Sequence, residues 1–155
     1  MKGKLTILIG ESGSGKSAYL KTLGNYPYPS EYTCFGDMTM QKRLKNYERH
    51  LKQCDDSPIL LEEIFVSDEL VIDIVLEIIN IVSDGKDVVM ICSNEMIYRR
   101  IFNEIDDDID IKDIKVLFFD NSKYRELSKD EMFSYNKMRM FLNLDQFKKK
   151  SKKEV

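Results

Sequence analysis

The sequence predicts an α/β fold, a three-layer sandwich with a mainly parallel five-stranded sheet and a C-terminal helix. Strand-like and helix-like segments alternate along the chain, which favours parallel strands joined by crossover helices. Residues 128–131, Ser-Lys-Asp-Glu, match a capping box, so a last helix is expected to begin there. The length of 155 residues suits one domain at 1–147, followed by a basic tail at 148–155 that is expected to be disordered.

The first part of the chain contains two predicted strands and two predicted helices. A strand at about 4–9 leads into a helix at about 16–24, which the prolines within 25–29 end. Each proline disfavours helix at the residue before it. A short second strand is expected at 31–35, and an amphipathic helix follows at 39–54. The apolar stripe of that helix recurs at spacings of four and three residues, at Met40, Leu44, Tyr47, Leu51 and Cys54.

The remaining segments continue the same alternation. Pro58 opens a third predicted strand at 59–61. A helix from Leu70 to about Val82, with a capping Ser67 before it, is apolar on nearly every side and should lie deep against the sheet. The last three expected elements are a buried fourth strand at 87–92, a helix around 95–105 and a fifth strand at 115–119.

Residues 10–17, G-E-S-G-S-G-K-S, fit the phosphate-binding P-loop (Walker A) pattern G-x-x-x-x-G-K-[ST] at each fixed position. Glycines let successive backbone N–H groups turn toward an anion. Lys16 supplies a positive charge for the β- and γ-phosphates, and the Ser17 hydroxyl can ligate Mg²⁺. A Gly/Ser-rich hairpin or linker is the alternative, and it would leave Lys16 and Ser17 as coincidences. The expected nucleotide contacts are Gly10, Glu11, Ser12, Gly13, Ser14, Gly15, Lys16, Ser17 and Ala18.

Two acids close the third predicted strand, in the run P-I-L-L-E-E at 58–63. This run resembles the Walker B element of P-loop NTPases in the division with an additional strand and a catalytic glutamate, which includes AAA-type and ABC-type ATPases. The resemblance implies that Glu62 and Ser17 hold Mg²⁺ and that Glu63 activates water as general base. Glu62 stands where aspartate is more usual. The alternative is a pair of acids exposed at a strand end.

The fourth predicted strand ends in Ser93 and Asn94. In the same division a polar sensor residue at this point touches the γ-phosphate or the attacking water. The resemblance implies that role for Asn94, or for Ser93, and it implies the strand order 5-1-4-3-2. The chain has no L-S-G-G-Q signature and no N-K-x-D motif, and it is too short for the helical lid of an AAA protein. It is therefore most similar to a small AAA-like core without a lid.

Four arginines are weaker candidates for a residue that stabilises transition-state charge. Arg99 and Arg100 come first, because they lie early in the predicted helix after the sensor position, and Arg43 and Arg49 come behind them. Surface solvation is the alternative for all four side chains. His50 has no evident Ser or Cys partner, so no catalytic role is assigned to it.

Composition narrows the partners and the compartment. The net charge of −3 does not favour nucleic acid as a partner, although the basic faces of the 39–54 helix and the lysines of 148–153 leave that partner open. Cys34, Cys54 and Cys92 form no metal-ligand pattern and are interpreted as reduced thiols. No apolar run reaches membrane-spanning length, and the first strand begins almost at the N-terminus. A cytoplasmic protein without membrane contact is therefore expected.

The favoured function is a Mg²⁺-dependent ATPase that transfers the γ-phosphoryl group of ATP to water, with Lys16, Glu63 and Asn94 as its catalytic residues. Hydrolysis would be coupled to a protein partner, to nucleic acid or to further copies of the chain. ATP is expected over GTP because the guanine-specific motif is absent. The alternative is a small-molecule or nucleotide kinase, in which Glu62 or Glu63 would activate an acceptor hydroxyl. A nucleotide-binding protein without turnover is a third possibility.

Overall fold

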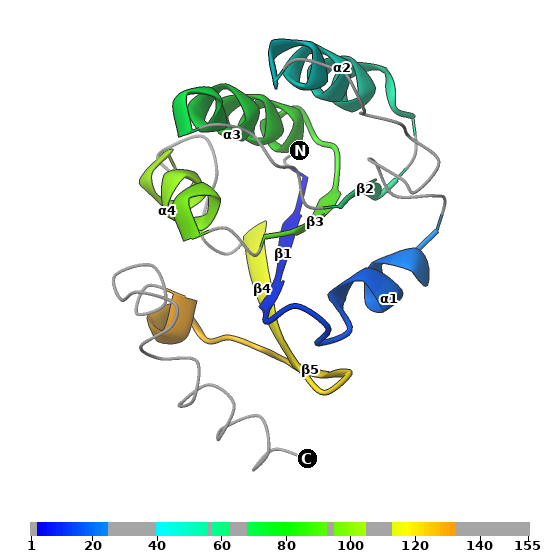
Figure 1. Cartoon of the computed structure of the whole chain (residues 1–155), viewed down its shortest axis with the longest axis vertical. Helices are drawn as coiled ribbons and strands as arrows, with labels where there is room; N and C mark the ends of the chain where they lie inside the picture. The colour runs from blue at the N-terminus through cyan, green and yellow to red at the C-terminus, as the bar shows by residue number, and fades with distance from the viewer. Residues whose placement is uncertain are drawn as a thin grey trace.

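The computed structural model describes residues 3–24, 40–55, 57–62, 68–92, 95–104 and 113–132 (Figure 1). The strands are β1 (Leu5–Gly10), β2 (Ile59–Leu61), β3 (Val88–Ile91), β4 (Ile114–Asp120) and β5 (Lys123–Glu126). The helices are α1 (Lys16–Lys21), α2 (Met40–Gln53), α3 (Asp68–Ser83) and α4 (Glu95–Glu104). The alternation of strands and helices expected from the sequence is confirmed over these segments.

The strands form one mainly parallel sheet in the order β2-β3-β1-β4-β5. The first four are parallel to one another, and β5 runs antiparallel to β4. β1 is the central strand, because Leu5 pairs with Val88 of β3 on one side and with Ile114 of β4 on the other. The segment that leaves the carboxyl end of β1 therefore starts from the middle of the sheet.

The predicted order, 5-1-4-3-2, numbers the five strands expected from the sequence, and it differs from the observed order. The predicted strand at 31–35 lies outside the described residues, and the fifth strand of the sheet is instead β5, which the sequence analysis missed. β5 follows β4 through the two-residue turn Asn121-Ser122, whose φ angles are 51° and 63°. Positive φ at both central residues is typical of hairpin turns that match the twist of the strands. The insertion of β3 between β1 and β2 does agree with the expected arrangement.

Helices cover both faces of the sheet, which gives three layers (Figure 1). Alternate residues of β1 point to opposite faces, as the period of a strand requires. Leu5, Ile7 and Ile9 belong to the larger core, which α2, α3 and α4 complete. Leu8 belongs to a smaller core beneath α1, which contains Leu20. The fold thus places α1 alone, among the described helices, over the second face.

The helices bury the faces that their apolar patterns predicted. Tyr47 and Leu51 of α2 are buried, and Cys54 packs against the same core. The side chains of Met40 and Leu44, in the predicted stripe, lie outside those that the structure describes. α3 is the deepest of the described helices, with buried Ile74, Val75, Ile78, Ile79, Ile81 and Val82.

The capping box at the predicted C-terminal helix is present. The Glu131 backbone N–H donates to Ser128 Oγ at 3.2 Å, and the Ser128 backbone N–H donates to Glu131 Oε1 at 3.1 Å. Arg125 of β5 donates to both oxygens of the same carboxylate, at 3.0 and 2.7 Å. The rest of the segment predicted to form the C-terminal helix, and the basic tail at 148–155, lie outside the described residues.

Two further expectations concern the thiols and the membrane. Cys54 and Cys92 are not in a disulfide, and Cys34 lies outside the described residues. Within the described part of the chain, no helix combines the length and the apolar character needed to cross a bilayer.

Candidate functional site

The glycine-rich segment after β1 curls at the carboxyl end of the central strand. Gly10, Gly13 and Gly15 have φ angles of 143°, 79° and 106°, and residues other than glycine rarely adopt these backbone angles. A Cβ atom on Gly10 would lie 2.6 Å from the carbonyl oxygen of Phe119, so only glycine lets this backbone lie against β4. The loop geometry thus explains why glycines stand at these positions.

Lys16, the first residue of α1, points its side chain back into this loop. Its Nζ donates to the carbonyl oxygens of Gly10 at 2.6 Å and Glu11 at 2.7 Å, and lies 3.4 Å from Ser14 Oγ. Only 6% of the Lys16 residue is exposed, although lysine is rarely buried so deeply. These three contacts hold the ammonium group within the loop.

Ser17 connects the loop to the end of β2. Its Oγ donates to Glu62 Oε2 at 3.2 Å, across 45 residues of sequence. Glu62 directly follows β2 and is half-buried, whereas Ser17 is exposed. The structure therefore brings together the two residues that the sequence analysis expected to share a cation, and the longer glutamate side chain does reach the serine.

The Ser17–Glu62 pair fits the ligand preferences of Mg²⁺. The ion prefers oxygen ligands at 2.0–2.1 Å in octahedral geometry, so two adjacent ligands lie roughly 3 Å apart. The observed separation of 3.2 Å between the two oxygens is close to that value. Among the described residues, no group of three or more His, Cys, Asp or Glu side chains forms a metal cluster. Mg²⁺ commonly binds one or two protein ligands together with substrate phosphates, and such a site needs no cluster.

Other expected site residues are only partly described. Glu63, Ser93 and Asn94 lie outside the described residues, so their roles stay predictions. The N–H of Cys92, just before Ser93, donates to Leu8 O at 2.9 Å, which brings the end of β3 beside the end of β1. Of the nucleotide contacts expected from the motif, Ser14 is buried, and Glu11, Ser12, Gly13 and Ala18 are exposed.

Two of the four candidate arginines lie on α2 and two lie on α4. Arg99 and Arg100 are exposed on α4, and Arg49 is exposed on α2. The side chain of Arg43 lies outside those described. Their proposed role in stabilising charge remains a prediction.

The contact between the loop and the β4–β5 turn was not predicted from the sequence. The Ser122 backbone N–H donates to Ser14 O at 2.9 Å, and a Cβ atom on Gly15 would lie 3.0 Å from Ser122 Cα. The local sequence signal for this turn is Asn121, because asparagine tolerates positive φ. The hairpin therefore supports the loop on the side opposite Glu62.

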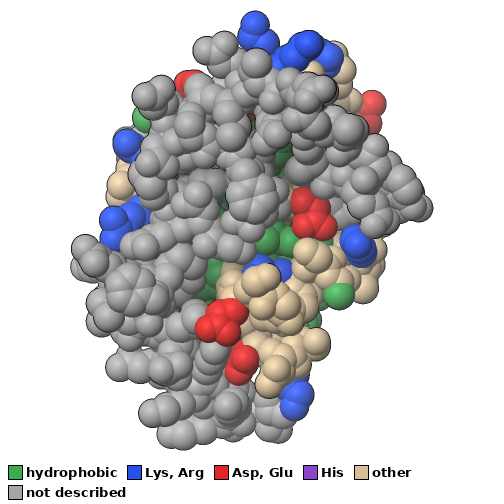
Figure 2. Space-filling view, in the orientation of Figure 1, with side chains coloured by type: hydrophobic (Ala, Val, Ile, Leu, Met, Phe, Trp, Pro, Cys, Tyr) green, Lys and Arg blue, Asp and Glu red, His purple; other side chains and the backbone are tan. Residues whose placement is uncertain are grey.

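Acidic side chains lie above and below a short strip of basic and hydrophobic surface in the described part of the face shown in Figure 2.

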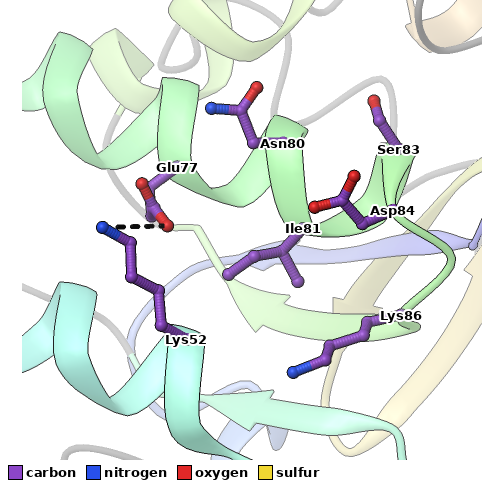
Figure 3. A pocket seen from close by; sticks show the side chains of 7 residues that line it. All are labelled: Lys52, Glu77, Asn80, Ile81, Ser83, Asp84 and Lys86. Atoms are coloured by element: carbon purple, nitrogen blue, oxygen red, sulfur yellow. Dashed lines mark ion pairs between the residues drawn. The ribbon is translucent and has the colours of Figure 1, made fainter.

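A separate depression of about 570 Å³ lies between α2, α3 and the turn before β3 (Figure 3). Lys86, in its wall, donates to Cys54 O at 3.1 Å. The exposed Lys52 forms an ion pair at 3.9 Å with the half-buried Glu77. Because Lys86 precedes β3, this depression lies at the amino end of the strands, away from the loop.

Comparisons with known proteins give no relative. No family model matches the chain, and no match was found among the curated proteins or the solved structures. A function is therefore inferred from the geometry of the loop and its neighbours.

The loop geometry predicts that two glycine substitutions differ in cost. Gly13→Ala should destabilise the protein by about 1–2 kcal/mol, because it places a side chain at positive φ with nothing within 4 Å of the new Cβ. Gly10→Ala should cost at least about 1 kcal/mol more, because its Cβ also meets the backbone of β4. Urea unfolding of both variants measures the difference, and equal free energies of unfolding would contradict the described loop.

Proposed function

We propose that the chain is a Mg²⁺-dependent P-loop nucleoside triphosphatase, which binds ATP and transfers its γ-phosphoryl group to water. The observation that carries the proposal is the contact between Ser17 and Glu62, because Ser17 follows the buried Lys16 directly in the sequence. A Gly/Ser-rich linker or hairpin without a binding site would not require this contact between a serine at the start of a helix and an acid at the end of a distant strand.

Lys16 contributes charge and preorganisation. Two unit charges 4 Å apart attract by about 1 kcal/mol in water and about 4 kcal/mol at an effective dielectric of 20, so burial strengthens the attraction for a phosphate. The carbonyl oxygens of Gly10 and Glu11 already hold Nζ within the loop. Binding therefore avoids much of the cost, up to about 2 kcal/mol, of ordering a free lysine side chain.

Ser17 and Glu62 would hold Mg²⁺ through their side-chain oxygens. When bound, the ion would neutralise the negative charge that develops on the phosphates during phosphoryl transfer. The hydrogen bond from Ser17 holds one oxygen of the Glu62 carboxylate beside the start of α1, where the phosphates are expected. The order of these residues along the chain agrees with the Walker A and Walker B resemblance.

Glu63 and Asn94 complete the proposed mechanism. Glu63 follows Glu62 directly, and as a general base it would take the proton of the attacking water. Asn94 follows the end of β3, beside β1, and would touch the γ-phosphate. ATP as the nucleotide, coupling to a partner or to further copies of the chain, and a cytoplasmic location are further parts of the proposal.

Lys16→Ala should weaken binding of Mg·ATP at least about 10-fold, because a charge-assisted hydrogen bond contributes about 1.5–3 kcal/mol. Lys21→Ala is the matched control, since Lys21 is exposed on the same helix and its loss changes the net charge equally. Titration calorimetry gives the affinities, and circular dichroism shows that both variants are folded. Equal affinities of the two variants would remove Lys16 from the site.

Glu63→Gln should abolish turnover and leave nucleotide binding intact, because an amide cannot accept the proton of water. The assay uses γ-labelled ATP and Mg²⁺, with and without DNA and a panel of nucleosides and nucleotides. Label released by the wild-type protein as inorganic phosphate supports the ATPase, and label transferred to an acceptor would support a kinase instead. Binding without turnover would reduce the proposal to a nucleotide-binding protein, and normal turnover of the variant would exclude Glu63 as the base.

A further inference from the structure

Three aromatic side chains gather beside the glycine-rich loop, on the β5 side of the sheet. The ring centroids of Tyr19 and Phe119 are 5.3 Å apart, those of Tyr19 and Tyr124 are 5.0 Å apart, and those of Phe119 and Tyr124 are 5.2 Å apart. Phe119 is buried at the base of this aromatic cluster, Tyr19 is half-buried, and Tyr124 is 51% exposed. A large apolar ring thus faces solvent on a rigid support.

The cluster is fixed relative to the loop. Tyr124 lies directly opposite Phe119 in the β4–β5 ladder, and cross-strand aromatic pairs of this kind hold each other in place. The turn of the same hairpin is bound to the loop through the Ser122 N–H and Ser14 O. Tyr19 is three residues beyond Lys16 on α1, so the third ring belongs to the helix that carries the phosphate-site lysine.

The helix geometry separates a cation side from an aromatic side. Successive residues of an α-helix are rotated by about 100°, so Ser17 and Tyr19 point in nearly opposite directions. Ser17 contacts Glu62 at the end of β2, and Tyr19 contacts β4 and β5. β2 and β5 are the opposite edges of the described sheet. If Mg²⁺ and the terminal phosphates lie near Glu62, a nucleotide that crosses the start of α1 extends its nucleoside toward the aromatic cluster.

We propose that the exposed ring of Tyr124, supported by Tyr19 and Phe119, is the platform on which the base of the bound nucleotide stacks. This inference rests on the proposed function and names the part of the nucleotide that lies outside the loop. Base stacking uses the π-face that every base has, and a purine offers the larger face. The platform therefore favours purine nucleoside triphosphates over inorganic polyphosphate and does not by itself distinguish adenine from guanine.

Tyr19 is expected to remain uncharged in such a platform. Burial, and next the neighbouring Tyr124, raise the pKa of Tyr19 above its usual value of 10.0. The phenol therefore stays neutral throughout the physiological range, and no phenolate opposes the nearby phosphates of a nucleotide.

Titration calorimetry of Mg·ATP and Mg·tripolyphosphate with three proteins tests the platform. Wild-type protein should bind ATP more tightly than tripolyphosphate, which has no base. Tyr124→Ala should weaken ATP binding roughly 5- to 100-fold, the usual range for loss of an aromatic ring beneath a base, and should leave tripolyphosphate binding unchanged. Tyr124→Phe, the matched control, keeps the ring and should bind ATP like the wild type.

The outcomes separate this inference from the proposed function. Unchanged ATP binding by Tyr124→Ala would overturn the platform, and so would an equal loss for ATP and tripolyphosphate, which would mean that the substitution disturbs the loop itself. Equal affinity of the wild-type protein for both ligands would also overturn the platform, while the phosphate site would stand. Failure of the wild-type protein to bind either ligand would overturn both.

Discussion

The backbone path at the end of β1 is the constraint on which the rest of the site depends. β1 is hydrogen-bonded on both sides, to β3 and to β4, so its carboxyl end has a fixed position in the sheet. Gly10 then turns the chain so close to Phe119 O that no side chain fits. Because the strand is fixed and the turn is sterically determined, the loop carbonyl groups that hold Lys16 are fixed as well. The site is preorganised by the sheet rather than by its own few contacts.

Three side chains of the short helix α1 point in three different directions. Lys16 points back into the loop, Ser17 points toward Glu62, and Tyr19 points toward the β4–β5 hairpin. A rotation of about 100° per residue makes this possible within four consecutive residues. In the proposed function these directions correspond to the phosphates, the cation and the base of one nucleotide. The hydrophobic anchor for the helix is Leu20, which packs into the smaller core under α1.

The sequence was informative wherever local chemistry fixes the structure. The spacing of glycine, lysine and serine predicted the loop, the apolar runs predicted β1 to β4, and Ser128 with Glu131 predicted a capping box that the structure contains. β5 was missed because K-Y-R-E has no apolar run. Its buried residue is Arg125, which is accommodated by two hydrogen bonds to Glu131. Without β5, neither the support of the loop by Ser122 nor the pairing of Phe119 with Tyr124 could be foreseen, because both depend on the hairpin register.

Binding of Mg·ATP within the loop at the end of β1 can be tested by measuring backbone amide chemical shifts during a titration with Mg·ATP. We expect the largest shifts in the amides of residues 11–18, whose N–H groups would line the phosphates. Saturating shifts confined to the depression between α2 and α3, or no shifts at all, would contradict it.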